Sequence, residues 1–150
     1  MERTGSQKLL KGLSIFNIVA STLSMLMGVL VIGGGALIAS GHSSAALQDL
    51  IQRLPVPADQ AGPLFIVMGI AILIACAFEI ATGIFGVRAA HDNTKIKPAW
   101  VFTLISLIAA VAAGAAAIVG GNATPTIAVS LGLSGLAFYA ANRVKTEAGI

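Results

Sequence analysis

The chain has few charged residues. Lys, Arg, Asp and Glu together make up 10 % of its 150 residues, whereas ordinary soluble domains contain about 25 %. A soluble fold of this size cannot cover its surface with so little charge. Disorder is excluded as well, because disordered chains are poor in apolar residues and this one is 57 % hydrophobic. With a mean hydropathy of +0.93, the composition indicates a membrane protein.

Cysteine and proline are also scarce. The single cysteine, Cys76, lies inside an apolar run, which excludes an intramolecular disulfide and a thiolate-type zinc or iron–sulfur site. His42 and His91 are expected at opposite membrane faces and so cannot form a shared metal or haem site, and we expect no metal and no cofactor. No Ser–His–acid set falls within the apolar runs, and we expect no enzymatic activity. The five prolines fall at the edges of runs or in one loop, which leaves the runs free to form continuous helices.

Four long apolar runs organise the sequence. They cover residues 13–40, 63–87, 98–119 and 126–141, and a helix needs about 20 apolar residues to cross the hydrocarbon core. The runs do not alternate with a period of two, as the strands of a membrane barrel do. The sequence therefore predicts an all-α membrane protein, with residues 1–150 as one four-transmembrane-helix bundle. Pro63 and Pro98 are expected in the first turns of the second and third helices.

The basic residues predict how the chain is threaded. Eight of the nine Lys and Arg residues lie before the first run, between the second and third, or after the fourth. Because Lys and Arg of short loops stay on the cytoplasmic side, we expect a multi-pass protein of the cell (cytoplasmic) membrane with both termini cytoplasmic. The exception, Arg53, falls in the first outer loop. The other eight are Arg3, Lys8, Lys11, Arg88, Lys95, Lys97, Arg143 and Lys145.

The net charge of +3 bears on possible partners. The basic residues stand singly or in pairs, without a basic stripe or interleaved aromatics, so a nucleic-acid partner is not expected. We expect affinity for anionic inner-leaflet lipid instead.

The first outer loop, residues 41–62, contains a helical pattern. Its apolar residues recur at i, i+3, i+4 and i+7, which predicts a short amphipathic helix. Two interpretations are open: a helix lying on the outer membrane surface, or a lid over the mouth of the bundle. The apolar residues are Leu47, Leu50, Ile51 and Leu54, with Ser43 or Ser44 as cap and Pro55 and Pro57 at the end.

Small residues recur along the apolar runs. Membrane helices associate through small residues and polar contacts, so these positions predict a tightly packed left-handed bundle. Alternatively, the same positions form a homo-oligomer interface or contact another membrane protein. The first run offers Ser14, Asn17, Ser21, Ser24, Gly28 and Gly35, and the second offers Gly69, Cys76, Glu79, Gly83 and Gly86.

Glu79 is the one charged residue inside an apolar run. Counting from Arg88 at about 1.5 Å per residue places Glu79 roughly 13 Å below the cytoplasmic edge. Intramembrane ionisable residues usually face a bundle interior or water. Glu79 is either a protonated hydrogen-bonding hub that fixes helix register or a proton or cation site. The polar residues expected near the same depth are Asn17, Ser21, Thr103, Ser106 and Ser134.

The end of the second run carries a family resemblance. Residues 78–90 read FEIATGIFGVRAA, and KPAWV follows at 97–101. The segment resembles small four-span bacterial membrane proteins of unassigned function, in which a Glu–Gly–Gly–Arg–Ala pattern ends the second span. That resemblance implies topology and no activity. The segment 79–82 also looks like the surroundings of the membrane-embedded Glu of small multidrug-resistance transporters, but their Glu lies in the first helix and Glu79 in the second.

Two functions follow as hypotheses. The first is a non-enzymatic scaffold or accessory subunit that acts through helix–helix contacts. The alternative is a small proton-coupled transporter or channel centred on Glu79.

Overall fold

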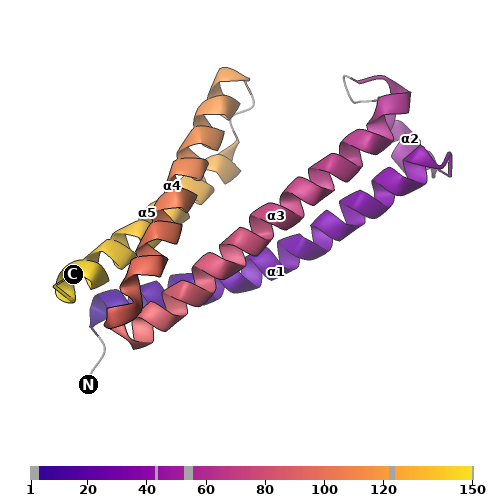
Figure 1. Ribbon diagram of the computed structural model, residues 1–150. Helices are drawn as coiled ribbons and strands as arrows, with labels where there is room; N and C mark the ends of the chain where they lie inside the picture. Colours follow the sequence, from indigo (N-terminus) through magenta and orange to yellow (C-terminus); the bar gives the residue numbers. More distant parts are fainter. Residues whose placement is uncertain (1–3, 43, 53–55, 122–123, 150) are drawn as a thin grey trace. The chain divides into compact units, whose positions relative to one another are not determined.

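The computed structural model describes residues 4–42, 44–52, 56–121 and 124–149, and within these ranges all regular structure is helical. Each of the four long helices is long and apolar enough to cross a membrane, which confirms the all-α, four-span prediction at that level. In chain order (Figure 1) the elements are α1 (Gly5–Ala39), α2 (Ala45–Gln52), α3 (Ala58–His91), the 3-10 helix η1 (Asn93–Lys95), α4 (Ile96–Val119) and α5 (Pro125–Glu147).

The helices extend beyond the predicted apolar runs. α1 has 35 residues and α3 has 34, well above the about 20 that a span requires. The prediction for Pro63 is wrong, because α3 begins at Ala58 and Pro63 is its sixth residue. A proline this close to the helix start removes only one backbone hydrogen bond, and Asp59 in the first turn complements the helix dipole. Pro98, the third residue of α4, lies in the first turn as predicted.

The surface of the long helices is apolar. Leu30 and Ile74 are each 67 % exposed and Val119 is 89 % exposed. Only 11–17 % of the most apolar window of each long helix is buried. Soluble monomers rarely expose contiguous apolar surface on this scale, so these faces are suited to lipid.

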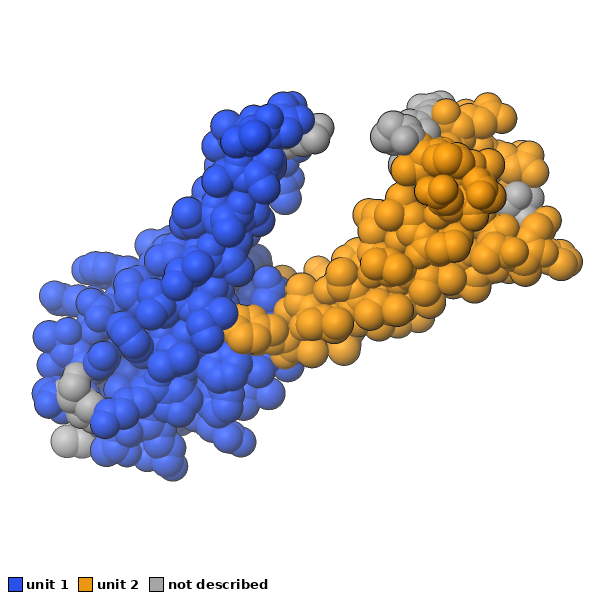
Figure 2. All heavy atoms as spheres, turned by 45° about the horizontal axis from the view of Figure 1, so that its top comes forward, with its two compact units in different colours: residues 1–19, 79–150 blue, residues 20–78 orange. Residues whose placement is uncertain are grey.

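The chain forms two compact units, which Figure 2 colours separately. One unit comprises residues 1–19 and 79–150, and the other comprises residues 20–78. We call the first the four-helix unit and the second the hairpin unit.

In the hairpin unit, glycines allow α1 and α3 to pack backbone against backbone. A Cβ atom added at Gly35 would lie 2.8 Å from the carbonyl oxygen of Gly62 and 2.9 Å from the amide nitrogen of Ile66. One added at Gly69 would lie 2.8 Å from the carbonyl oxygen of Gly28. Any larger side chain would separate the helices, which is the reason that small residues mark membrane-helix contacts.

The short helix predicted in the outer loop is present as α2 (Ala45–Gln52). Ser44, one of the two expected caps, directly precedes α2, and Pro57 directly precedes α3. The other expected cap, Ser43, lies outside the described residues, as do Arg53, Leu54 and Pro55. The side chains of Leu47 and Leu50 are likewise not described.

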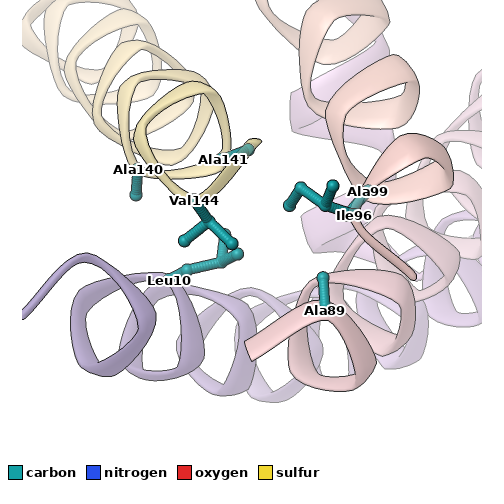
Figure 3. Close-up of a cluster of buried hydrophobic side chains, with 7 residues drawn as sticks. All are labelled: Leu10, Ala89, Ile96, Ala99, Ala140, Ala141 and Val144. Atoms are coloured by element: carbon teal, nitrogen blue, oxygen red, sulfur yellow. The ribbon is translucent and has the colours of Figure 1, made fainter. Parts of the chain in front are cut away.

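In the four-helix unit, all four long helices contribute to one buried cluster (Figure 3). The close-up shows the side chains of α1 and α5 pointing toward each other, with those of α3 and α4 beside them. Several members are alanines, which permits close approach of the helices. The members are Leu10 of α1, Ala89 of α3, Ile96 and Ala99 of α4, and Ala140, Ala141 and Val144 of α5.

The same end of the four-helix unit brings the start of α1 to the end of α5. The hydroxyl of Thr4 donates to Glu147 Oε2 at 2.8 Å, and that of Ser6 donates to Glu147 Oε1 at 2.9 Å. The α3–α4 connection lies at this end too, since Ala89 and Ile96 belong to the buried cluster. Three basic segments of the sequence therefore converge. Arg3 lies outside the described residues.

Candidate functional site

A cavity of about 60 Å³ lies in the four-helix unit and is lined by α1, α3, α4 and α5. Its volume equals about two water molecules at ~30 Å³ each. Most of its polar lining comes from hydroxyl groups. The polar lining residues are Ser14, Asn17, Glu79, Thr82, Thr103, Ser106 and Ser134.

The cavity brings together most of the polar residues expected near Glu79. Asn17, Thr103, Ser106 and Ser134 all line it with Glu79. Ser21 is not a lining residue; it is 1 % exposed and belongs to the hairpin unit. Asn17, which the depth count placed one turn shallower than Ser21, donates a hydrogen bond to the backbone of Glu79.

Two lining residues, Ser14 and Thr82, were not among the polar residues expected near Glu79. Thr82 lies three residues after Glu79, and Ser14 lies three residues before Asn17, so each shares a helix face with a predicted member. That spacing was the available signal. Both residues are buried, as is Thr103. Glu79, in contrast, is exposed.

Asn17 fixes the register of α1 against α3 at the cavity. Its Nδ2 donates to the backbone carbonyl oxygen of Glu79 at 3.0 Å. A Cβ atom added at Gly83, the next turn of α3, would lie 2.5 Å from Ile18 and 2.8 Å from the carbonyl oxygen of Ser14. The helices are thus held close at the level of Glu79, and the amide oxygen of Asn17 remains an acceptor.

Thr103 and Ser106 differ in their hydrogen bonding. Thr103 Oγ1 lies 2.9 Å from the carbonyl oxygen of Ala99 and 3.0 Å from that of Trp100, so its proton is donated within α4 and its lone pairs stay available. Ser106 Oγ is buried and has no hydrogen-bond partner among the residues that the structure describes. Native proteins leave few buried polar atoms unsatisfied, which makes Ser106 the unusual member of the lining.

The polar atoms of the lining side chains are oxygens that can bind a cation, apart from the amide nitrogen of Asn17. Carboxylate, amide and hydroxyl oxygens suit water, a proton or a hard cation, and they do not suit soft transition metals. In the described part of the chain, no group of three or more His, Cys, Asp and Glu residues is placed to hold a metal ion. His42 Nδ1 lies 3.0 Å from the carbonyl oxygen of Ser40, and His91 Nδ1 lies 2.8 Å from that of Val87.

Beyond the cavity, Trp100 anchors the neighbouring surface of α4 and α5. Its Nε1 donates to Asn142 Oδ1 at 3.2 Å, and Lys145 Nζ lies 3.8 Å from the centre of its ring. This cation–π contact and hydrogen bond hold the two helices together near the basic end of the four-helix unit.

Comparison with protein-family models, with curated proteins and with solved structures finds no match for this chain. The resemblance of residues 78–90 to small four-span bacterial proteins is therefore not assigned to a family. Four long apolar helices, packed around one buried cluster where they meet, indicate a four-span membrane protein.

Proposed function

We propose that the chain spans the cytoplasmic membrane four times with both termini on the cytoplasmic side. The support is the convergence of the start of α1, the α3–α4 connection and the end of α5 in the four-helix unit. These segments carry Lys8, Lys97 and Arg143, and basic residues of short loops remain cytoplasmic. This basic end is also suited to anionic lipid headgroups of the inner leaflet.

The function that the geometry supports best is that of a small proton- or cation-coupled transporter or channel centred on Glu79. The carrying observation is the cavity, which polar side chains of four apolar helices line together with the carboxyl of Glu79. A volume of about 60 Å³ leaves room for a guest, and the buried hydroxyl of Ser106 has no hydrogen-bond partner among the described residues.

Proton flux into proteoliposomes tests this function. A potassium diffusion potential drives protons inward, and an entrapped pH-sensitive dye reports the flux. We expect Glu79→Gln to reduce the protein-dependent flux to the level of empty liposomes, because an amide does not exchange protons. Asp59→Asn is the matched control, since Asp59 is an exposed carboxylate of the same helix outside the cavity. Unchanged flux through the Glu79→Gln protein would refute the transport proposal.

A scaffold or accessory role is the second candidate, and an observation on α5 favours it. Gly132 and Gly135 have open space where a Cβ would stand, and with Ala128 they share a face at i, i+4 and i+7. Gly28 and Gly35 of α1, in contrast, are already packed against α3. The face of α5 around Gly132 and Gly135 is thus an open small-residue surface for a second membrane protein or a second copy.

Gly132→Leu distinguishes this role from transport. The substitution should abolish self-association or partner co-purification in mild detergent, because a bulky side chain blocks close helix approach. Gly33→Leu is the control, since Gly33 has equally open surroundings on α1. If the wild type and both variants are all monomers without a co-purifying partner, the scaffold role is rejected.

A further inference from the structure

We propose that the Glu79 cavity binds one hard monovalent cation of the size of sodium. This inference rests on the proposed transport function and specifies its ligand. It is carried by the chemistry, charge and size of the cavity, taken in turn.

The ligand chemistry is that of a hard cation. Glu79 offers carboxylate oxygens, Asn17 an amide oxygen, and Ser134 a hydroxyl, all from different helices around one space. The Thr103 hydroxyl donates its proton within α4, so its lone pairs are available to the cavity. Ligand sets made only of oxygen favour sodium, potassium, calcium and magnesium over transition metals.

The single carboxylate of the site favours a monovalent cation over a divalent one. Glu79 is the only ionisable residue among those that line the cavity, and the lining is otherwise neutral. One carboxylate neutralises a monovalent cation, whereas a divalent cation would retain an uncompensated charge among apolar helices, where it is strongly disfavoured.

The size of the cavity excludes large substrates. Sites for drug-sized molecules occupy about 300–1,000 Å³, and this cavity has about 60 Å³. A sodium ion with one retained water fits within a space of about two water volumes. Ser106 then gains the partner that it lacks among the described residues, either the ion or its water.

Thermal unfolding of the full chain in mild detergent tests the proposal. Sodium chloride is compared with N-methylglucamine chloride at equal ionic strength, so that only the cation changes. A ligand that binds only the folded state raises the melting temperature, and we expect a rise of about 5 °C at sodium concentrations far above Kd for a chain of this length. Potassium should give a smaller shift, and calcium no larger one than sodium.

Variants establish that the shift arises in the cavity. Ser106→Ala and Glu79→Gln should each remove the sodium-dependent shift, while Ser130→Ala, an exposed hydroxyl of α5 outside the cavity, should keep it. If Ser106→Ala does not fold, Ser134→Ala takes its place. No shift in the wild type, a shift retained in the cavity variants, or a larger shift with calcium would overturn the proposal.

The two proposals fail separately. Glu79-dependent proton flux without sodium stabilisation would reject the sodium site and leave transport standing. Sodium stabilisation with proton flux unaffected by Glu79→Gln would keep the site and reject proton-coupled transport.

Discussion

Asp92 organises the connection between α3 and α4. Its Oδ1 accepts hydrogen bonds from the backbone nitrogen of Thr94 at 3.1 Å and from the hydroxyl of Thr94 at 2.6 Å. Lys95 Nζ lies 3.2 Å from its other carboxylate oxygen. The side-chain hydrogen bond from Thr94, followed by that from Lys95, lowers the pKa of Asp92 below its usual value. One carboxylate thus caps η1 and stabilises the turn that leads into α4.

A pH titration of Asp92 tests this capping role. Because the pKa is lowered in the folded state, the stabilisation is present above the usual aspartate value of about 3.9 and is lost as the pH falls through the lowered value. We expect NMR of the labelled carboxyl to show a midpoint below that of a free aspartate. Thr94→Ala should raise the midpoint toward the usual value, whereas Thr126→Ala, on distant α5, should leave it unchanged. An unchanged midpoint in the Thr94→Ala protein would contradict the assignment.

At the scale of elements, α1 and α3 share a seven-residue repeat of small buried side chains. Such a repeat keeps one seam facing the partner helix when the two coil left-handedly. Gly35 meets Gly62 and Gly28 meets Gly69 in the hairpin unit, and Ser14 meets Gly83 in the four-helix unit. Ser24, which shares the predicted face, is exposed. The repeat comprises Ser14, Ser21, Gly28 and Gly35 on α1 and Gly62, Gly69, Cys76 and Gly83 on α3, all buried.

Gly35 and Gly33 form a matched pair for testing this seam. A Cβ at position 35 would lie 2.8 Å from a backbone oxygen, while one at position 33 meets nothing within 4 Å. We expect Gly35→Ala to lower the free energy of unfolding by about 1–3 kcal/mol through overpacking, and Gly33→Ala to leave it unchanged or raise it slightly. Unfolding in detergent with increasing denaturant measures both. Equal stability of the two variants would disprove backbone-to-backbone packing at Gly35.

At the scale of the whole molecule, the proposed threading puts the basic segments at one membrane face and the apolar helix surfaces within the bilayer. The segments around Lys8, Lys95 and Arg143 are expected on the cytoplasmic side, and α2 with the α4–α5 turn on the outer side. The exposed apolar faces of the long helices then lie against the hydrocarbon core, where helices satisfy their own backbone hydrogen bonds.

Cysteine labelling in intact cells tests the threading. In a Cys76→Ala background, Gln60→Cys at the start of α3 should react with a membrane-impermeant maleimide. Lys95→Cys, in the α3–α4 connection, should react only after the cells are opened, because Lys and Arg of short loops are retained inside. Both positions are exposed in the structure, so access to the reagent is decided by the membrane. Labelling of Lys95→Cys in intact cells would reverse the orientation.

The sequence by itself determined the four long helices and the short helix between the first two. Long apolar runs in a bilayer have few alternatives to helix, because every backbone polar group must be satisfied internally. Hydropathy therefore predicted four long helices, and the i, i+3, i+4 pattern predicted α2. Four of the five polar residues expected near Glu79 line one cavity with it.

Only the tertiary structure decided the register between helices. Asn17 donates a hydrogen bond to the backbone of Glu79, and the small-residue repeat buries Gly28 while leaving Ser24 exposed. Helix packing also decides that the polar lining encloses a cavity and that, among the described residues, the hydroxyl of Ser106 has no hydrogen-bond partner. The physical reason is that a helix's own period fixes which residues share a face, whereas close packing against a second helix fixes which of them meet.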